Sequence, residues 1–322
     1  MTEISCLYLR LPNWVGDVCM SLPSLRLLQA TGVPLVLCAR PWARDLLAGV
    51  SGQDFLPMSG KWKIDRAAVA AHRRGLGARA RDARGLLLPD SLSSAAVFRL
   101  AGVASAGYRD DGRSVLLRWP VAKPTAPLHA VQSWYHLART ALGRWNLPQG
   151  PADPGPALDL PLTDAHRQAA QAALHGSGLA GRPLVLIAPT ATGLHRGRVK
   201  VWPEFDTLTR ALQADGHAVA MCPPPAEAEQ ARRNAPTAQV LPPLSLGAFA
   251  ALARQAALVV CNDSGVSHVA AAVGARQLTL FGVTQPARTG PWSPTASCLG
   301  SEGNWPAPDE VRIQVLRLLA GA

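Results

Sequence analysis

The sequence of 322 residues has few charged and few aromatic side chains, at 16% and 5% of the chain. The low charged fraction and the 48% of hydrophobic residues exclude a disordered chain or a coiled coil. They are typical of two ordinary domains with buried cores. No apolar run approaches the roughly 18 residues of a membrane-spanning helix. The first residues lack a basic head, an apolar core and a small-residue cleavage site, so we expect no secretory signal and a cytoplasmic location.

Cysteine is sparse, and its spacing disfavours the common thiol sites. The six cysteines are scattered, and no two form a CxxC pair. Most lie in or beside apolar stretches, which predicts free, buried thiols in a reducing compartment and no metal site. The chain also lacks a GxGxxG fingerprint after its first apolar run, which disfavours a dehydrogenase.

Negative charge is scarce relative to positive charge. The formal net charge is +11, and most of the excess lies in residues 1–160. A basic half indicates an anionic partner such as nucleic acid, an acidic membrane surface or a phosphorylated substrate. An arginine-rich composition that only keeps the protein soluble is an equal alternative. Nucleic acid is the less favoured partner, because aromatic residues are few and are not interleaved with Lys/Arg runs.

Short apolar runs alternate with helix-like stretches in both halves, which predicts βαβ units on parallel sheets. The Pro- and Gly-rich segment 146–160 indicates a linker between the halves. We therefore expect an α/β protein with two Rossmann-like, doubly wound domains facing a central cleft. Their bounds are 1–155 and 156–322, with the final helix, from near Pro308, free to pack back on the first domain. The predicted strands are Ile4–Leu11, Pro34–Ala39, Gly85–Leu88, Pro183–Ile187, Ala218–Cys222, Ala257–Cys261 and Gln277–Phe281.

The segment Asn262–His268, NDSGVSH, joins a predicted strand to an alanine-rich helix. Free amides of Ser264–Val266 at the helix N-terminus favour an anion through hydrogen bonds and the helix dipole. His268 adds a donor toward the same phosphate, and Asp263 is placed to accept hydrogen bonds from sugar hydroxyls. The alternative is that Asp263 or Ser264 is an N-cap without a ligand.

A second loop, Pro189–Glu204, follows another predicted strand and ends in Trp-Pro-Glu. Thr190, Thr192 and Lys200 supply hydroxyls and an ammonium that suit a diphosphate. The arginines of this loop either assist or are solvated charges. The loop is not a Walker A motif, which needs Gly-Lys-Ser/Thr at the start of a helix.

The third candidate segment is Leu11–Met20, LPNWVGDVCM, directly after the first predicted strand. Gly16 permits a tight turn from strand to helix, and Asp17 follows it. A carboxylate at this point can take a proton from an attacking hydroxyl. An N-cap aspartate, with Trp14 as a packing residue, explains the same pattern equally well.

Four segments, taken in order, resemble one enzyme family. They are Leu11–Gln29, LPDS at Leu88–Ser91, KVWPE at Lys200–Glu204, and Val260–Leu280 with its extension FGVTQPARTGPW. Together they are similar to the ADP-heptose:lipopolysaccharide heptosyltransferases of glycosyltransferase family 9, and NWVGD and LPDS most resemble heptosyltransferase II. The resemblance implies a GT-B fold, with the acceptor on the N-terminal domain, the nucleotide sugar on the C-terminal domain, and no metal.

The resemblance also implies roles for individual residues. Asp17 matches the family's proposed catalytic base, Lys200 matches the lysine that holds the diphosphate, and Asp263 matches the aspartate near the donor sugar. The family's neighbours of the nucleotide phosphates are matched by Ser264, Gly265 and His268.

The nucleoside contacts are implied less directly. Glu227 falls where the family places an acid that binds ribose, with Glu229 as a rival, and the backbone near Leu244 is a candidate for adenine. Two features depart from the family pattern. The loop before Lys200 is longer and more basic, and Pro223–Pro225 replace a small acidic run, so the donor's identity stays open.

The implied partners are an ADP-sugar donor and the anionic inner core of lipopolysaccharide. This acceptor lies at the cytoplasmic face of a membrane, so we expect a monomer in peripheral contact with that surface. Asn13, Arg109 and Arg113 are the acceptor candidates, with solvated surface arginines as the alternative. Asp110 and Asp111 are assigned to a solvated loop, not to a metal motif. A family member with another donor or acceptor, or a non-catalytic binder of nucleotide sugars, remains a rival.

Overall fold

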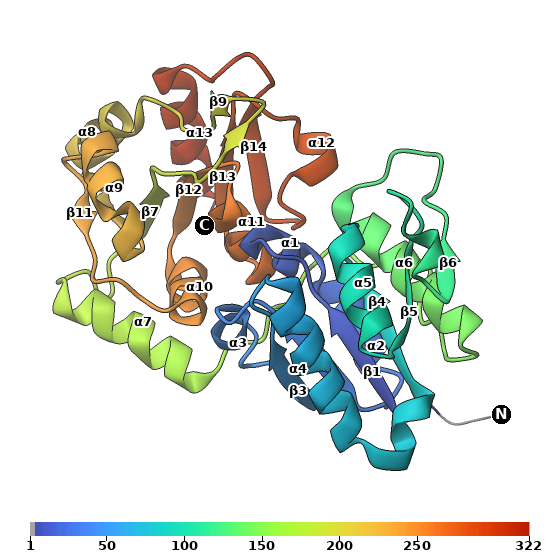
Figure 1. Cartoon of the computed structure of the whole chain (residues 1–322). Helices are drawn as coiled ribbons and strands as arrows, with labels where there is room; N and C mark the ends of the chain where they lie inside the picture. The colour runs from blue at the N-terminus through green and yellow to red at the C-terminus, as the bar shows by residue number, and fades with distance from the viewer. Residues whose placement is uncertain (1–3, 322) are drawn as a thin grey trace. The chain divides into compact units, whose positions relative to one another are not determined.

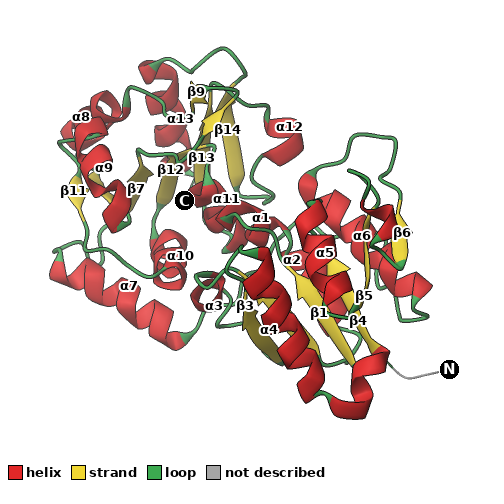
Figure 2. Ribbon diagram, viewed as in Figure 1, coloured by secondary structure: helices red, strands yellow, loops and turns green. Residues whose placement is uncertain are grey.

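The computed structural model describes residues 4–321, which form two compact units. Within the described residues, one unit comprises 4–44 with 50–155, and the other comprises 45–49 with 156–321. Each contains a six-stranded sheet flanked by helices (Figure 2). No helix within residues 4–321 is long and apolar enough to cross a membrane.

The sheet of the first unit has the strand order β3-β2-β1-β4-β5-β6, and all neighbouring strands run parallel. Strands β1 and β2 are buried at every position, as expected for a parallel sheet covered on both faces. Helices α4 and α5 pack together over one face (Figure 1). The strands are β1 (Cys6–Arg10), β2 (Leu35–Ala39), β3 (Gln53–Pro57), β4 (Ala83–Leu87), β5 (Ala104–Tyr108) and β6 (Trp119–Val121). The helices are α1 (Val15–Met20), α2 (Leu22–Gln29), α3 (Ala43–Leu46), α4 (Trp62–Gly75), α5 (Leu92–Leu100) and α6 (Ala130–Arg144).

The second unit repeats this topology with the order β11-β10-β7-β12-β13-β14. Alternate residues of its strands, such as Val185 and Val260, pack with Phe205 of α8 and Val311 of α13 in one core. The final helix therefore lies in the second unit. The strands are β7 (Leu184–Ala188), β10 (Ala218–Met221), β11 (Gln239–Val240), β12 (Leu258–Asn262), β13 (Gln277–Phe281) and β14 (Ala296–Gly300). The helices are α7 (Asp164–Gly176), α8 (Phe205–Ala214), α9 (Ala228–Asn234), α10 (Leu246–Gln255), α11 (Gly265–Ala272), α12 (Pro286–Thr289) and α13 (Pro308–Ala320).

Numbered within its own unit, each sheet has the strand order 3-2-1-4-5-6 of the Rossmann fold. The predicted class, two Rossmann-like doubly wound units, is therefore confirmed. In this topology ligands bind at the carboxyl ends of the first and fourth strands, where the winding direction reverses. Four segments with candidate chemistry follow these strands: residues 11–17 after β1, 88–91 after β4, 189–193 after β7 and 263–268 after β12. The candidates Glu227 and Leu244 instead follow β10 and β11.

The cysteines are part of the apolar interior. All six are free, and all but Cys298 are buried, in agreement with the prediction of free buried thiols. Burial raises the pKa of the Cys261 thiol to about 12, so this side chain is protonated at neutral pH and packs as a small apolar group.

Candidate functional site

The side-chain amide of Asn262 connects three segments at the carboxyl end of β12. Its Oδ1 accepts a hydrogen bond from the backbone N–H of Trp202 at 2.8 Å. Its Nδ2 donates to the carbonyl oxygens of Ala188 and Thr190, both at 3.3 Å. The side chain is fully buried, so these bonds do not compete with bulk water. They hold the loop after β7 and the segment before α8 against the end of β12.

The position of Lys200 follows from the anchoring of Trp202, two residues later. The indole of Trp202 is 1% exposed, donates to the carbonyl oxygen of Pro306 at 2.9 Å and packs edge-to-face on Phe205. Lys200 Nζ donates to the backbone oxygen of Asp263 at 2.9 Å and lies 3.8 Å from its Oδ2 atom. The KVWPE segment thus places a half-buried ammonium beside the NDSG turn.

The carboxylate of Asp263 is 6% exposed and is held by a second loop. Thr284 Oγ1, after β13, donates to Asp263 Oδ2 at 2.6 Å. The same loop passes under the Trp305 ring at Gly282, where a Cβ atom would lie only 2.0 Å from the ring. Asp263 is therefore not an N-cap. The contact with Thr284 was not predicted, although this threonine lies in the family-like extension FGVTQPARTGPW.

Helix α11 begins at Gly265 with Ser264 as its N-cap. The Ser264 hydroxyl accepts a hydrogen bond from the Val266 N–H at 3.3 Å, so Ser264 caps this helix, as one of the two interpretations predicted. One of the three amides expected to face an anion is therefore engaged by the cap. His268 lies in the first turn and is 6% exposed.

The structure separates the two candidate ribose acids. Thr190 Oγ1 donates to Glu227 Oε2, which places Glu227 beside the loop after β7. Glu229 instead pairs with Arg233 on the exposed side of α9. Only Glu227 is therefore gathered with the other donor candidates.

The remaining donor candidates lie on two loops of the same sheet. Leu244 is half-buried and follows β11, in a segment tied to β10 by a hydrogen bond from the Cys222 thiol to the Pro242 carbonyl at 3.3 Å. Thr192 is exposed in the loop after β7. The predicted residues are thus distributed over the ends of β7, β10, β11 and β12.

The long basic loop before Lys200 is a small hairpin of β8 (Leu194–His195) and β9 (Arg198–Val199). Arg196 and Gly197, both with positive φ, form its two-residue turn. Arg198 Nη2 lies 3.2 Å and Arg196 Nη1 lies 3.7 Å from Glu302 Oε1. The hairpin arginines therefore face an acid of their own unit.

Asp17 lies at the carboxyl end of the first sheet. Helix α1 begins at Val15 with Trp14 at its N-cap, so Asp17 is in the first turn and the N-cap interpretation is wrong. Trp14 is 71% exposed and is not a packing residue. Burial raises the pKa of the Asp17 carboxyl to about 6. A carboxyl group of this pKa is largely ionised at neutral pH and is still basic enough to accept a proton.

Asn13 is exposed, but its side chain is held in place by a buried arginine. Arg10, the last residue of β1, is 5% exposed and donates from Nη2 to Asn13 Oδ1 at 2.6 Å. Its Nη1 donates to the carbonyl oxygen of Leu11. Burial lowers the pKa of Arg10, and the backbone and amide acceptors satisfy its guanidinium. An arginine ending an apolar strand was the sequence signal for this positioning residue.

The structure corrects the assignment of Arg113 to direct acceptor contact. Its side chain is fully buried, and Nε donates to the carbonyl oxygen of Tyr108 at 2.6 Å. Nη1 donates to the carbonyl oxygens of Pro89 and Ser91 in the LPDS segment. Arg113 therefore supports this segment from inside, whereas Arg109 is exposed.

The acidic residues near LPDS are paired with a lysine. Lys123 Nζ lies 2.6 Å from Asp90 Oδ2 and 2.7 Å from Asp110 Oδ2. Asp110 is therefore part of an ion-pair network, and Asp111 is exposed. This network fixes the loops after β4 and β5.

Comparison with known proteins agrees with this geometry. The model of glycosyltransferase family 9 (heptosyltransferase) matches residues 69–319. The lipooligosaccharide heptosyltransferase 2 of Haemophilus influenzae is 28% identical over 89% of this chain and 86% of its own length. The lipopolysaccharide heptosyltransferase 2 of Escherichia coli is 28% identical over 88% of this chain and 84% of its own length.

Solved structures show the same fold. The structure of E. coli ADP-heptose LPS heptosyltransferase II is similar with a TM-score of 0.76 and 25% identity, over 98% of both chains. E. coli heptosyltransferase WaaC with ADP has a TM-score of 0.75 and 22% identity, over 97% of this chain and 99% of its own. The similarity extends over both units.

We expect Asn262→Ala to lower the free energy of unfolding by about 2–4 kcal/mol, because it leaves one N–H and two carbonyl groups without their buried partner. Asn304→Ala, at an exposed asparagine of the same unit, is the matched control and should unfold like the wild type. Urea unfolding measures both variants. Equal stability of the two would contradict the anchoring role of Asn262.

Proposed function

Because the chain belongs to glycosyltransferase family 9, the heptosyltransferase family, we propose that it transfers heptose from ADP-heptose to the inner core of lipopolysaccharide. The observation that carries the proposal is the cluster of Lys200, Asp263 and Thr190 at the carboxyl ends of β7 and β12. Parallel sheets of this topology bind nucleotides at this position. The similar structures with ADP and with an ADP-heptose analogue support the choice of donor.

Each donor residue has a task that fits its surroundings. The Lys200 ammonium balances the negative charge of the diphosphate, and the backbone amides at the start of α11 add hydrogen-bond donors. Glu227 accepts hydrogen bonds from the ribose hydroxyls, and the backbone at Leu244 contacts adenine. Asp263, fixed by Thr284, accepts hydrogen bonds from the hydroxyls of the transferred sugar.

The proposed reaction is a single displacement with inversion at the anomeric carbon. Asp17 takes the proton from the acceptor hydroxyl, whose oxygen forms the new bond to the anomeric carbon. The bond from that carbon to the diphosphate oxygen breaks, and ADP leaves with the electron pair. Charge on the leaving diphosphate is stabilised by Lys200 and by the α11 amides, so we propose that this chemistry needs no metal.

The proposed acceptor accounts for part of the positive charge in the first half of the chain. Inner-core lipopolysaccharide carries carboxylates and phosphates, and the exposed Asn13 and Arg109 are its proposed contacts. We propose that the protein acts as a monomer in the cytoplasm, in peripheral contact with the inner membrane.

We expect the rate to depend on the ionised form of Asp17. The pKa of about 6 predicts that kcat/KM for the acceptor is constant at pH 7–8. Below pH 6 it should fall about tenfold per pH unit as the carboxylate is protonated. Asp17→Asn should bind ADP normally but lose about 10²–10⁴-fold in kcat, whereas Asp54→Asn, at an exposed acid, should keep it. Wild-type turnover by Asp17→Asn would exclude Asp17 as the base.

We also expect Asp17→Asn to change the stability of the protein in a pH-dependent way. Folding raises the pKa of Asp17 from 3.8 to about 6, so the folded state binds the proton more tightly than the unfolded state. The stabilisation from the protonated form is present below pH 3.8 and is lost as the pH rises through 6. We therefore expect Asp17→Asn to be at least as stable as the wild type at pH 8, with a difference that shrinks toward pH 4. Thermal unfolding at several pH values measures it, and a variant less stable at pH 8 would contradict the burial of this carboxylate.

Lys200→Ala should raise the dissociation constant for ADP by about tenfold to a hundredfold, because a charge-assisted contact with the diphosphate is lost. Arg198→Ala removes a cation that faces Glu302, and should leave ADP binding unchanged. Isothermal titration calorimetry measures both. An equal effect of the two variants would indicate general electrostatics instead of a phosphate contact at Lys200.

The two glutamates after β10 give a matched pair. Glu227→Gln should weaken ADP binding about tenfold, because one charged acceptor for the ribose is lost, and Glu229→Gln should not. The ratio of the dissociation constants for ADP and 2′,3′-dideoxy-ADP should differ between Glu227→Gln and Glu229→Gln only if the Glu227 carboxylate contacts the ribose. A larger loss of ADP affinity in Glu229→Gln than in Glu227→Gln would assign the ribose contact to Glu229.

Donor identity is tested by transfer onto truncated lipopolysaccharide cores from ADP-heptose, ADP-glucose and UDP-sugars in parallel. We expect product only from ADP-heptose. Transfer from another sugar nucleotide would favour a different donor within the family, and ADP binding without transfer from any donor would favour a non-catalytic binder.

A further inference from the structure

The outward face of α4 and α5 carries unbalanced positive charge. Helix α4 and its N-cap contain a single acid, Asp65. Asp65 is 4% exposed, and its carboxylate accepts hydrogen bonds from the Ser59 N–H and hydroxyl and from the Gly60 N–H. It is thus turned inward and does not offset the cations outside. Five of these cations are exposed, and Arg73 is half-buried. The basic face is defined below as Lys61, Lys63, Arg66, Arg73, Arg74 and Arg99 of α5.

Large apolar side chains are exposed on the same two helices. Trp62 is 48% exposed and Ile64 is 54% exposed near the start of α4. Leu92 and Leu100, at the two ends of α5, are 51% and 56% exposed. Single exposed apolar residues are common in proteins, but here four share two packed helices with six cations. Tryptophan and aliphatic side chains among Lys/Arg are typical of surfaces that lie in the membrane interface.

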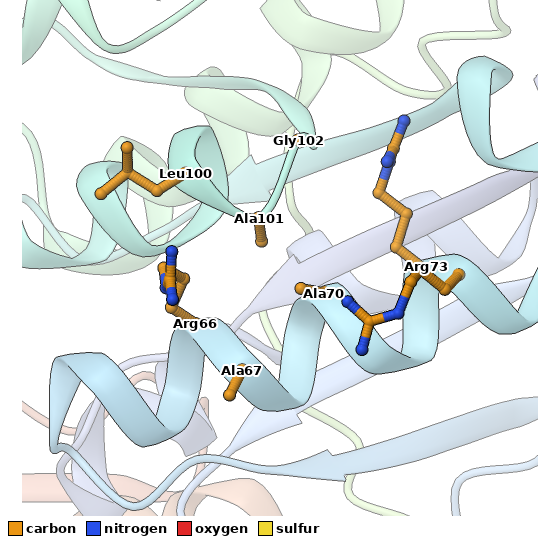
Figure 3. Close-up of a pocket in the computed structure, with 8 residues that line it drawn as sticks. Arg66, Ala67, Ala70, Arg73, Leu100, Ala101 and Gly102 are labelled. Carbon is orange, nitrogen blue, oxygen red and sulfur yellow. The ribbon is translucent and has the colours of Figure 1, made fainter.

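A groove of about 520 Å³ opens at the far end of this face. Arg66, Arg73 and Arg74 line it from α4, and Leu100 lines it from α5. Figure 3 shows the small side chains of α4 between the labelled arginines, opposite the end of α5. Gly102 is required on that wall, because its φ is +81° and a Cβ atom would lie 3.0 Å from Arg73 Nη1. Three arginines line this groove, and the guanidinium group is the side chain best suited to bind a phosphate group.

We propose that the basic face docks the protein on a membrane of anionic phospholipid, with a headgroup phosphate in the groove and Trp62, Ile64 and Leu100 in the interface. The proposal deepens the proposed function, since an acceptor held in a membrane has to be reached at that surface. Charge complementarity favours an anionic bilayer, and the exposed apolar side chains favour it over nucleic acid. Single-stranded RNA would need a series of stacking aromatic side chains, and these two helices expose one.

Binding to vesicles without any lipopolysaccharide tests the proposal. The full-length protein should sediment with phosphatidylglycerol vesicles and not with phosphatidylcholine vesicles, and added salt should weaken the binding. Each basic side chain near an anionic surface contributes about a fivefold factor in binding, so Arg66→Gln/Arg74→Gln should bind about thirtyfold more weakly. Arg182→Gln/Arg232→Gln removes the same charge from exposed positions of the second unit, and should bind like the wild type.

A second pair of variants tests the apolar part. Ile64→Ser/Leu100→Ser keeps every charge, and should lose the binding that remains at about 1 M salt, where charges are screened within about 3 Å. Both side chains are exposed, so circular dichroism and thermal unfolding should match those of the wild type. Unchanged vesicle binding in both pairs would overturn the proposal, and so would equal binding to phosphatidylcholine.

Two further measurements distinguish the membrane role of this surface from the proposed catalytic function. ADP affinity and turnover with a lipid-free, water-soluble core acceptor should be unchanged in Arg66→Gln/Arg74→Gln. Loss of turnover with that acceptor, at full vesicle binding, would show that the groove serves the acceptor and would overturn the membrane role. Loss of affinity for single-stranded RNA, without loss for vesicles, would assign the face to nucleic acid.

Discussion

The candidate site of the second unit depends on one buried amide. Asn262 accepts a hydrogen bond from the segment before α8 and donates to two carbonyl groups at the end of β7. An aliphatic side chain of similar size would leave these groups buried without partners, and an aspartate would bring an uncompensated charge. Lys200 and Thr190 lie on the two segments that Asn262 joins. The geometry of the proposed diphosphate site is therefore set by a residue to which we assign no contact with the substrate.

We assign different chemistry to the two units, although they share one topology. In both sheets the chain reverses its winding direction between the first and fourth strands. The loops that follow these two strands therefore lie side by side at their carboxyl ends. In the first unit that edge holds Asp17, a carboxyl whose pKa burial raises to about 6. In the second unit it holds an ammonium and the capped start of α11. We assign proton transfer to the first and stabilisation of the leaving diphosphate to the second. Both tasks need groups that are held in place before the substrate arrives.

The positive charge of the chain is divided between interior and surface. Arg10 and Arg113 are buried and donate mainly to backbone oxygens, which fixes the loops after β1 and β4. Arg198 faces Glu302 and tethers the hairpin before Lys200. The cations of the basic face other than Arg73 are exposed, and the one acid of α4 points into the protein. A formal net charge therefore says little about partners until the buried arginines are distinguished from the exposed ones.

The sequence by itself determined the two Rossmann-like halves, because buried parallel strands such as β2 and β7 are unbroken apolar runs. It also determined the family and the order of its motifs. It did not reveal β3, an edge strand whose polar residues and proline hide the strand pattern, or β14, which is half-exposed. The strands β5, β6 and β11 were also not predicted. Only the tertiary structure brought Glu227 to Thr190 and left Glu229 on the exposed side of α9, turned Arg113 inward and brought Thr284 to Asp263. Each of these outcomes depends on contacts between residues far apart in the chain, which local periodicity and spacing do not encode.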